Sequence, residues 1–527
     1  MPTHEVRNVP PPWRDPDTFA SDRLLQTVSY SDAEIKQLHQ LGELAGSEQA
    51  QEWGRLANAH PPVLRTHDRA GRRIDQVEFH PAWHELMRIA VSHGMHATPW
   101  RDGSHLGRAV RFYLWAQVEA GHGCPISMTY AIVPALRHHP ALASQYEPLL
   151  TAMAYDPGLR APQTKSGLLA GMAMTEKQGG SDVRANTTCA APLADHYVLT
   201  GHKWFCSAPM CDLFLVLAQA PGGLSCFLVP RVLPDGTRNP FALQRLKDKL
   251  GNRSNASAEV EFDGTRGWLV GEEGAGIRTI IDMVNMTRLD CVIGSAAGQR
   301  AAVVQALHYV RHRAAFGALL ADQPLMREVL ADMVAESAAS TALFLRLAHA
   351  VDDGEPAFLR LAVATAKFWV CKRTPAVVGE ALECLGGNGY AEDSGLPRLF
   401  RESPLNAIWE GSSNVIALDV LRAVQRDPDS VTAFFDELAT TSGADARLDA
   451  AVVQLGAVLG RLGTDPIADQ GTARNLAGLL ARALAASLLV RSGPPAAAER
   501  YLVNVLHGPP AIFGSRPGPG TRALITE

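Results

Sequence analysis

Two changes in the pattern of apolar residues divide the chain and limit the folds that are possible for it. From residue 31 to about 165, apolar residues recur at helical spacing, and the segment 31–46 opens with a Ser-Asp cap. Between about 168 and 275, short β-rich runs alternate with Gly, Pro and Asp, which is typical of a small β-barrel or sandwich. Long Ala-rich helical patterns return from 276. This order lacks βαβ alternation, and no Gly-x-Gly-x-x-Gly follows a strand, so it argues against a Rossmann fold.

The same changes divide the chain into segments. The first 30 residues are a Pro-rich arm, and the second helical region ends near Arg426-Asp427-Pro428-Asp429, which indicates a linker. Further amphipathic helices extend to about residue 507, and the tail 507–522, rich in Pro and Gly, is expected to be loose. The predicted domains are residues 1–167, 168–275, 276–426 and 427–527.

The composition is that of a globular protein with a large core. Hydrophobic residues make up 46% of the 527 residues and charged residues 20%, and the formal net charge is -5. A chain with this balance is not built to grip nucleic acid or an anionic membrane, although it can still carry a local basic patch. The longest uncharged stretch, 213–230, is broken by Pro221-Gly222-Gly223 and indicates strand, turn and strand. We expect no membrane partner.

The eight cysteines are scattered, and none forms a CxxC pair. Reduced thiols in a cytoplasmic protein are the simplest interpretation, and a zinc site would need clustered Cys and His residues. The N-terminus has several prolines and no apolar core, unlike a signal peptide. We therefore expect a cytoplasmic protein without a metal.

Two motifs accompany the β-rich region. The polar, Gly-rich segment 174–182 (Met-Thr-Glu-Lys-Gln-Gly-Gly-Ser-Asp) is either a plain turn or a loop whose hydroxyls and backbone N–H groups hold a phosphate or a flavin edge. The segment 201–207 (Gly-His-Lys-Trp-Phe-Cys-Ser) indicates a strand. It is either simply a buried aromatic strand or the wall of a flavin site, because Phe205 and Ser207, two residues apart, share one strand face.

Two further motifs lie in the second helical region. Arg313-Ala-Ala-Phe316-Gly317 ends a helix and enters a turn, and Gln323 follows; an isolated Arg and Gln are usually surface residues. The other motif combines Glu383–Tyr390, Arg401 and the segment 408–414 (Ile-Trp-Glu-Gly-Ser-Ser-Asn). Here Glu410 precedes a run that opens a helix, whose uncapped N–H groups would face whatever lies beside this carboxylate. The simpler alternative is a solvated Glu at a helix start.

Together, in this order, the four motifs resemble the acyl-CoA dehydrogenase family, and most closely its AidB-like branch. The segments 54–58, 79–84 and 245–257 also resemble that branch, up to about residue 425. The resemblance implies a mainly α fold with a central β-barrel domain: a helical N-terminal domain, a β-barrel and a four-helix FAD and catalytic domain, here with an extra C-terminal helical domain. It also implies a homotetramer. Lys177, Phe205 and Glu383 depart from the family pattern, and the Arg-to-Gln spacing is one residue short.

The resemblance further implies an FAD cofactor and an acyl-CoA-type substrate. Glu410 would be the catalytic base, since the alternative family position, before Arg288, holds Thr287. Arg288 itself would contact the substrate. The residues expected to bind FAD, part of it from a neighbouring subunit, are Met174, Thr175, Gln178, Gly180, Ser181, Phe205, Ser207, Arg313, Phe316, Gln323, Gly386, Gly387, Ile408, Trp409, Gly411, Ser412, Ser413 and Asn414.

Two functions remain open from the sequence. One is FAD-dependent dehydrogenation of an acyl thioester; a Glu base argues against nitroalkane oxidation, for which members of this fold use Asp. The other, implied by the AidB-like branch, is binding of double-stranded DNA in the response to alkylation damage, with weak or vestigial dehydrogenation. From residue 441 onward eight arginines face six acidic residues, an excess of two positive charges, which predicts only a weak grip on phosphate per chain.

Overall fold

A computed structural model of the chain describes residues 3–463, 469–508 and 512–526. The chain forms two compact units, which we call the barrel unit (residues 49–290) and the helical unit (residues 1–48 and 291–527). Helix α7 (Gly276–His312) contributes residues to both. The boundaries of the four predicted domains are not tested by this division and stay predictions. Each unit is described by itself.

Helices of the barrel unit begin at recognisable caps. Ser104 accepts a hydrogen bond from the N–H of Gly107, and Pro81 occupies the first turn of the preceding helix. The helices are α2 (Glu48–Ala59), α3 (Pro81–Ser92), α4 (His105–Ala116), α5 (Gly123–Leu136) and α6 (Pro140–Leu150). Helix α5 is buried almost throughout, and its Thr129 hydroxyl accepts a hydrogen bond from the N–H of Ala170 at 2.9 Å, which ties the helix to the first strand of the sheet.

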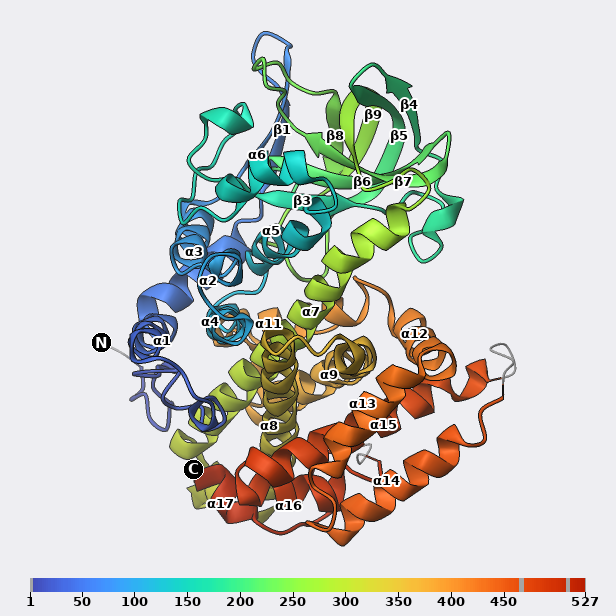
Figure 1. Cartoon of the computed structure of the whole chain (residues 1–527). Helices are drawn as coiled ribbons and strands as arrows, with labels where there is room; N and C mark the ends of the chain where they lie inside the picture. Colours follow the sequence, from blue (N-terminus) through green and yellow to red (C-terminus); the bar gives the residue numbers. More distant parts are fainter. Residues whose placement is uncertain (1–2, 464–468, 509–511, 527) are drawn as a thin grey trace. The chain divides into compact units, whose positions relative to one another are not determined.

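The strands of this unit close into a barrel (Figure 1). They are β3 (Ala170–Ala173), β4 (Cys189–Leu193), β5 (His196–Ser207), β6 (Leu213–Ala220), β7 (Gly223–Pro230), β8 (Phe241–Leu246) and β9 (Ser257–Val270). The order is β3-β6-β4-β5-β9-β7, and β7 pairs back to β6, while β8 adds to β9. Every residue from Leu213 to Ala218 is buried, because β6 faces the barrel interior on one side and the α-helical layer on the other.

A β-hairpin interrupts the region that the sequence pattern assigns to helices. Strand β1 (Val63–His67) pairs antiparallel with β2 (Arg73–Glu78), and the Asp68 carboxylate accepts the N–H groups of Ala70 and Arg72 in the turn. The helical assignment was wrong here because short exposed strands carry little apolar periodicity. The hairpin is anchored by Arg73, which donates to the carbonyl of Leu243 on β8 at 2.6 Å.

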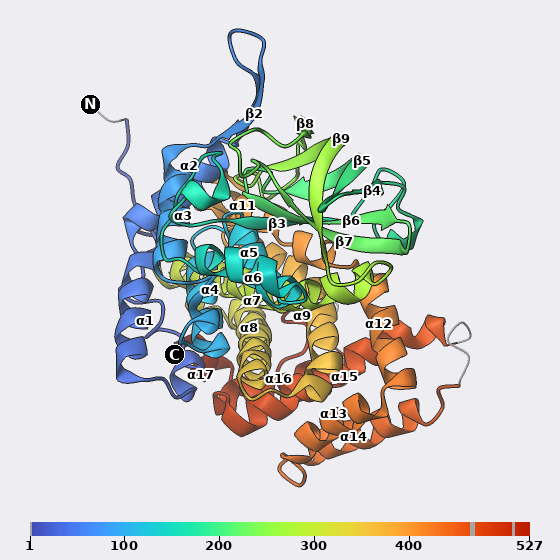
Figure 2. The same ribbon diagram turned by 45° about the horizontal axis from the view of Figure 1, so that its top comes forward.

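Helices of very different length form the helical unit (Figure 2). They are α1 (Asp32–Ala45), the second part of α7, α8 (Pro324–Asp352), α9 (Pro356–Cys384), α10 (Gly387–Tyr390), α11 (Leu396–Glu402), α12 (Ser413–Arg426), α13 (Pro428–Ala439), α14 (Ala446–Leu459), α15 (Ala473–Ser492), α16 (Pro495–Asn504) and α17 (Thr521–Thr526). A two-residue hairpin, β10 (Ala314–Ala315) and β11 (Ala318–Leu319), joins α7 to α8. Helices α8 and α9 lie side by side, and α15 packs against both. The expected linker is a single residue, Asp427, which caps α13.

One helix of the described residues is long and apolar enough to cross a membrane by length and composition alone. It spans residues 470–492 and includes α15, and 78% of its apolar window is buried within the protein. A core helix passes the same test, and the contacts of α15 with α8, α9 and α12 make it such a helix.

The C-terminal tail is packed, so the expectation of a loose tail was wrong for its described part; residues 509–511 lie outside the described residues. Phe513 is buried in a core cluster of the helical unit. The N–H groups of Gly514 and Gly518 donate to the carboxylates of Asp332 and Glu328 on α8. Polar contacts, which composition does not reveal, hold this Pro- and Gly-rich segment.

A fully buried guanidinium organises this corner. Arg500 on α16 donates to Asp332 at 2.7 Å and to Glu328 at 2.7 Å. We predict that Arg500→Leu lowers the free energy of unfolding by about 3–5 kcal/mol, because it leaves the Asp332 carboxylate buried without its cation. Denaturant unfolding measures this, and the exposed Arg522→Leu is the matched control, with an expected change within about 0.5 kcal/mol. Equal stability of the two variants would contradict the prediction.

Candidate functional site

The polar loop 174–182 follows strand β3 and turns around one buried carboxylate. Glu176 is fully buried and accepts hydrogen bonds from the N–H of Thr187 at 2.7 Å, the N–H of Thr188 at 3.1 Å and the Nζ of Lys203 at 2.8 Å. The N–H of Trp204 donates to the carbonyl of Thr175 at 2.8 Å, which joins the loop to β5. The loop is therefore pinned at its centre to two neighbouring segments.

The ion pair at the centre of this loop stays charged at neutral pH. Burial opposes the ionised form of Glu176, but the hydrogen bonds from Lys203 and from the N–H of Thr187 outweigh it and hold the pKa of Glu176 well below its usual range. Burial lowers the pKa of Lys203 to about 8, against the pull of Glu176. Sequence reasoning did not select these two residues, although both lie inside the motifs it used.

Pinning Glu176 inward leaves the predicted loop residues accessible. Met174 and Thr175 are half-buried, whereas Gln178 and Ser181 are exposed. A Cβ on Gly180 would lie 2.3 Å from Oγ1 of Thr175, so only glycine allows this close approach. The side-chain amide of Gln178 donates to the Glu176 carboxylate at 2.7 Å and to the carbonyl of Ala185 at 3.3 Å. The loop thus presents hydroxyl and backbone donors at the surface of the barrel unit.

A β-bulge shapes the neighbouring strand. The register between β5 and β9 shifts between Lys203 and Cys206, so Trp204 and Phe205 lie in the irregular part of the strand. Phe205 is 53% exposed, whereas Cys206 is buried. Ser207 is half-buried, and its hydroxyl lies 3.3 Å from that of Ser257. An exposed aromatic face beside hydroxyl groups and the polar loop suits a planar ring with polar edges, and so fits the expected flavin.

The remaining predicted residue of this unit, Arg288, lies on α7 beside Thr287. Thr287 is buried, and its hydroxyl donates to the carbonyl of Val284 at 3.1 Å. Arg288 is half-buried. A hydroxyl in this state cannot act as a general base near neutral pH.

In the helical unit, the third motif forms the hairpin between α7 and α8. Phe316 and Gly317 occupy its tip with φ of +51° and +80°, and Phe316 is 98% exposed. Arg313 donates to the carbonyl of Asn8 at 2.6 Å, and Gln323 donates to the carbonyl of Ala315 at 3.2 Å. These bonds fix the base of the hairpin and leave the aromatic tip facing outward.

The Gly-Gly motif lies at the end of α9. Gly386 adopts φ +60° and precedes the short helix α10, and no atom lies within 4 Å of a Cβ placed on Gly386 or Gly387. The backbone is therefore open at these two residues, so a flat or anionic group can approach it closely.

Glu410 lies in a tight turn before α12 and adopts φ +57°, a left-handed conformation that is uncommon for a residue other than glycine. Gly411 follows with φ +102°. Trp409 donates its indole N–H to Oδ1 of Asn406 at 2.8 Å, whereas Ile408 is exposed. Strained residues of this kind persist only where surrounding contacts determine them, and they cluster at functional sites.

Helix α12 opens directly after this turn. Ser412 is its N-cap, and its side chain makes no capping hydrogen bond, so the first N–H groups of the helix do not use it. The hydroxyl of Ser413 donates to the carbonyl of Ala407 at 3.4 Å, and Asn414 is exposed. The expected helix start is present, with its positive end beside Glu410 in the chain.

The predicted residues thus fall into two sets, one in each unit. The barrel unit holds Met174, Thr175, Gln178, Gly180, Ser181, Phe205, Ser207 and Arg288, and the helical unit holds Arg313, Phe316, Gln323, Gly386, Gly387 and the segment 408–414. Among the described residues, no group of three or more His, Cys, Asp or Glu side chains has the arrangement of a metal site.

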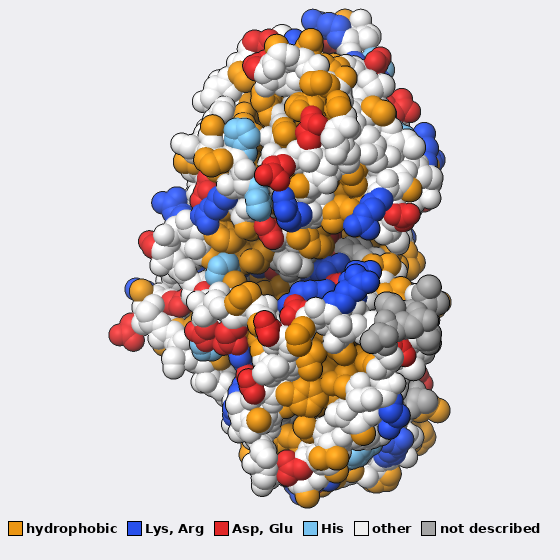
Figure 3. Space-filling model, turned by 45° about the vertical axis from the view of Figure 1, so that its right-hand side comes forward, with side chains coloured by type: hydrophobic (Ala, Val, Ile, Leu, Met, Phe, Trp, Pro, Cys, Tyr) orange, Lys and Arg blue, Asp and Glu red, His pale blue; other side chains and the backbone are white. Residues whose placement is uncertain are grey.

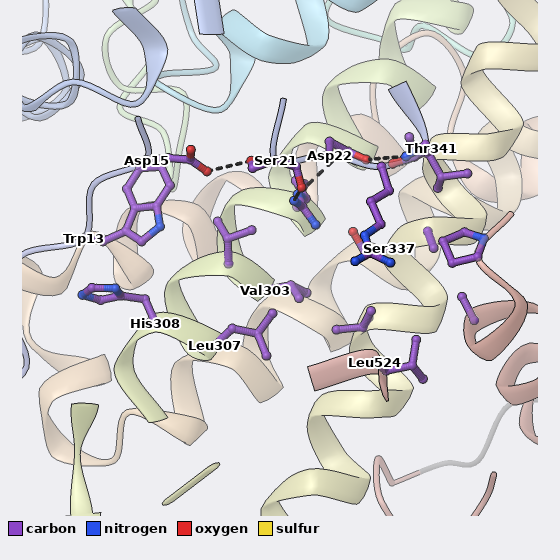
Figure 4. Close-up of a pocket in the computed structure, with 18 of the residues that line it drawn as sticks. Trp13, Asp15, Ser21, Asp22, Val303, Leu307, His308, Ser337, Thr341 and Leu524 are labelled. Carbon is purple, nitrogen blue, oxygen red and sulfur yellow. Dashed lines mark hydrogen bonds and ion pairs between the residues drawn. The ribbon is translucent and has the colours of Figure 1, made fainter. Parts of the chain in front are cut away.

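A separate cavity of about 380 Å³ lies within the helical unit (Figure 4). The N-terminal segment covers it, and α7, α8, α16 and α17 line it. Its floor is apolar, with Val303, Leu307 and Leu524, and ion pairing of Asp22 with Arg300 closes part of its rim. None of the predicted site residues is among those that line it, so this cavity is not the expected flavin or acyl site.

Comparison with known proteins agrees with the motifs. Family models match residues 8–157 (adaptive response protein AidB, N-terminal domain), 171–265 (acyl-CoA dehydrogenase, middle domain) and 274–425 (acyl-CoA dehydrogenase, C-terminal domain). AidB of Escherichia coli (strain K12) is 48% identical over 466 residues, 86% of each chain.

Solved structures agree on the fold. ACDH-11 of Caenorhabditis elegans, in complex with C11-CoA, has a TM-score of 0.86 at 26% identity and covers 95% of this chain and 93% of its own. An acyl-CoA dehydrogenase of Bacillus anthracis, complexed with FAD, has a TM-score of 0.70 at 18% identity and covers 90% of this chain and 85% of its own. The expected fold class is confirmed, and the chain belongs to the acyl-CoA dehydrogenase family of FAD-dependent oxidoreductases, in its AidB-like branch.

Proposed function

We propose that this protein binds FAD and dehydrogenates an acyl-CoA thioester, with Glu410 as the base that removes the α-proton. The observation that carries this proposal is the turn of Glu410, in which a carboxylate is held in a left-handed conformation directly before the N-terminus of α12. A solvated Glu at a plain helix start needs no such strain, so the alternative of an ordinary surface residue is disfavoured.

The chemistry assigns separate tasks to the side chain and the backbone of Glu410. The α C–H bond of the thioester breaks, its proton goes to the carboxylate, and negative charge develops on the thioester oxygen. The N–H of Glu410 would donate to that oxygen, as an oxyanion hole does. FAD, when bound, supplies the acceptor for the hydride that leaves the β-carbon, so the product is an α,β-unsaturated thioester. Arg288 would help to orient the substrate.

Each unit offers residues that suit a part of the cofactor. The exposed Ser181, with Phe205 and Ser207, suits the flavin ring and its neighbouring phosphate, and Gln178 lies exposed in the same loop. The open backbone at Gly386 and Gly387 suits the ADP part. The FAD in the related structure from Bacillus anthracis and the C11-CoA in that of ACDH-11 support both ligand classes for this chain.

DNA binding is the second candidate, which the resemblance of the sequence to the AidB-like branch implies. The charged residues of the C-terminal helices argue against strong binding of DNA phosphates. Five of the eight arginines after residue 441 make ion pairs or hydrogen bonds within the protein: Arg447, Arg482, Arg491, Arg500 and Arg516. Val453 on α14 is exposed. Figure 3 shows a broad apolar area with scattered basic side chains on the helical unit. We therefore place DNA binding second.

We predict that the purified protein is yellow and that one acyl-CoA of a chain-length series bleaches the flavin band near roughly 450 nm under anaerobic conditions. Glu410→Gln should retain FAD and lose at least about 10³-fold of the bleaching rate, since an amide cannot accept the α-proton. Asp393→Asn, an exposed acid of the same unit, is the matched control and should bleach like wild type.

The outcomes separate the two functions. Bleaching that survives in Glu410→Gln would refute the assignment of the base. If no thioester bleaches a flavin that stays bound, dehydrogenation is refuted as the main role. Salt-dependent retention of double-stranded DNA in a gel-shift titration would then favour the second function.

The buried pair in the 174–182 loop generates a prediction about cofactor content. Glu176→Gln removes the charge that Lys203 requires and should lower the FAD-to-protein ratio at least about threefold, because a buried unpaired ammonium destabilises the loop. Asp263→Asn, exposed on β9 of the same barrel, should keep the wild-type ratio.

The depressed pKa of Glu176 sets the sign of the pH effect. The stability that ionised Glu176 gives the folded protein is fully present above the ordinary pKa of Glu. It is lost only as the pH falls through the lower pKa that Glu176 has in the folded protein.

We also propose a homotetramer in which the hairpin tip contacts a neighbouring subunit and its FAD. An almost fully exposed Phe316 on a rigid two-residue turn supports this, as such side chains are usually covered in an assembly. Phe316→Asp should lower the mass measured by light scattering and reduce FAD retention. An unchanged mass would refute this contact.

A further inference from the structure

A buried lysine lies beneath the turn that carries Glu410. Lys367, in the middle of α9, is 2% exposed. Its Nζ donates to three backbone carbonyls, those of Asn406 at 3.1 Å, Trp409 at 3.0 Å and Gly411 at 2.9 Å. An ammonium group has three donors, so the contacts satisfy it completely. All three acceptors belong to one short segment, and two of them flank Glu410 in the chain.

A second set of hydrogen bonds holds the same segment. Asn406 donates through Nδ2 to the hydroxyl of Ser295 on α7 at 3.0 Å and accepts the indole N–H of Trp409 at 2.8 Å. The hydroxyl of Ser295 donates in turn to the Sγ of Cys371 on α9 at 3.3 Å. The turn is therefore bonded to two helices of the helical unit, and Lys367 provides its only cationic donor among these contacts.

The bond to Trp409 has an additional electronic consequence. The carbonyl of Trp409 and the N–H of Glu410 belong to the same peptide group. A cation that donates to the carbonyl oxygen draws electron density through the conjugated amide and makes its N–H a stronger donor. The interior position of Lys367 enhances this effect, since charges interact more strongly where water is excluded.

We propose that Lys367 is a positioning residue for the reaction, which fixes the left-handed turn of Glu410 and polarises the N–H of Glu410 that faces the thioester oxygen. This inference rests on the proposed function. It assigns two effects to one side chain: the carboxylate is held where the α-proton is removed, and the oxyanion hole gains strength from a charge that never touches the substrate.

A purely structural role would be different. A lysine that only stabilises the turn would affect folding and FAD content, but it would not change how strongly the Glu410 N–H polarises a bound thioester. The stretching frequency of the thioester carbonyl reports that polarisation directly, because a stronger donor weakens the C=O bond and lowers the frequency. The rate of exchange of the α-proton with D₂O reports the acidity that follows from it.

The test compares Lys367→Met and Lys367→Gln with wild type, all loaded with FAD, and uses a saturating acyl-CoA carrying ¹³C at the thioester carbon. We expect Lys367→Met to retain its fold, to exchange the α-proton about 10- to 100-fold more slowly, and to change KM less than about threefold. The carbonyl frequency should rise toward its value in water. Lys367→Gln keeps hydrogen-bond donors but no charge, so its exchange rate and carbonyl frequency should lie between those of Lys367→Met and those of wild type.

Lys372→Met is the matched control, since Lys372 lies on the same helix and is exposed. It should match wild type in all three measurements. If Lys367→Met does not fold, Lys367→Gln carries the test alone. A carbonyl frequency and an exchange rate equal to those of wild type in any folded Lys367 variant would overturn the inference. Failure of wild type itself to exchange the α-proton of any thioester would instead refute the proposed function.

Discussion

Buried cations must find acceptors, and two buried lysines of this protein find them on segments that hold predicted site residues. Lys203 pairs with Glu176 in the loop 174–182, and Lys367 donates to the turn before α12. In the same way, Arg500 on α16 pairs with Asp332 on α8. An unpaired charge in the interior costs several kcal/mol, so each loop is held in one conformation by the need to satisfy its cation. Irregular segments thereby gain the rigidity of the helices and strands beneath them.

This arrangement explains how irregular segments of the barrel unit and of the helical unit can hold predicted site residues in fixed positions. The sheet supplies a bulge, which exposes Phe205 while Cys206 stays buried. In the helical unit the predicted residues lie at helix ends. Gly386 and Gly387, whose backbone is accessible, follow α9, and α12 begins without a side-chain capping hydrogen bond. Regular structure fixes the ends of each loop, and one or two buried polar contacts fix its middle. Function then resides in segments that are irregular in geometry but determined in position.

Local signals in the sequence were sufficient for much of this picture. Ser31 caps α1 as expected, and α12 opens at Ser413, because caps and turns depend on neighbouring residues. The hairpin β1–β2 was mispredicted because its short, exposed strands carry little apolar periodicity. The packed tail was mispredicted because its partners on α8 lie far along the chain. Likewise, nothing near Lys367 indicates that its ammonium serves a turn some 40 residues later, as the contact exists only after α9 and that turn meet.

The strained conformation of Glu410 is the strongest reason to assign it a chemical role. A left-handed non-glycine residue costs on the order of 1 kcal/mol or more, and glycine at this position would remove that cost. The chain instead places the glycine next, at Gly411, and holds the turn with a buried lysine, which donates to the backbone carbonyls of Trp409 and Gly411, and with a hydrogen-bonded asparagine. Packing alone gives no reason to keep a charged side chain in such a turn. A role as catalytic base explains the charged side chain, because the base must lie at a fixed place beside its own backbone N–H. The left-handed conformation sets the direction of the carboxylate and of this N–H at once.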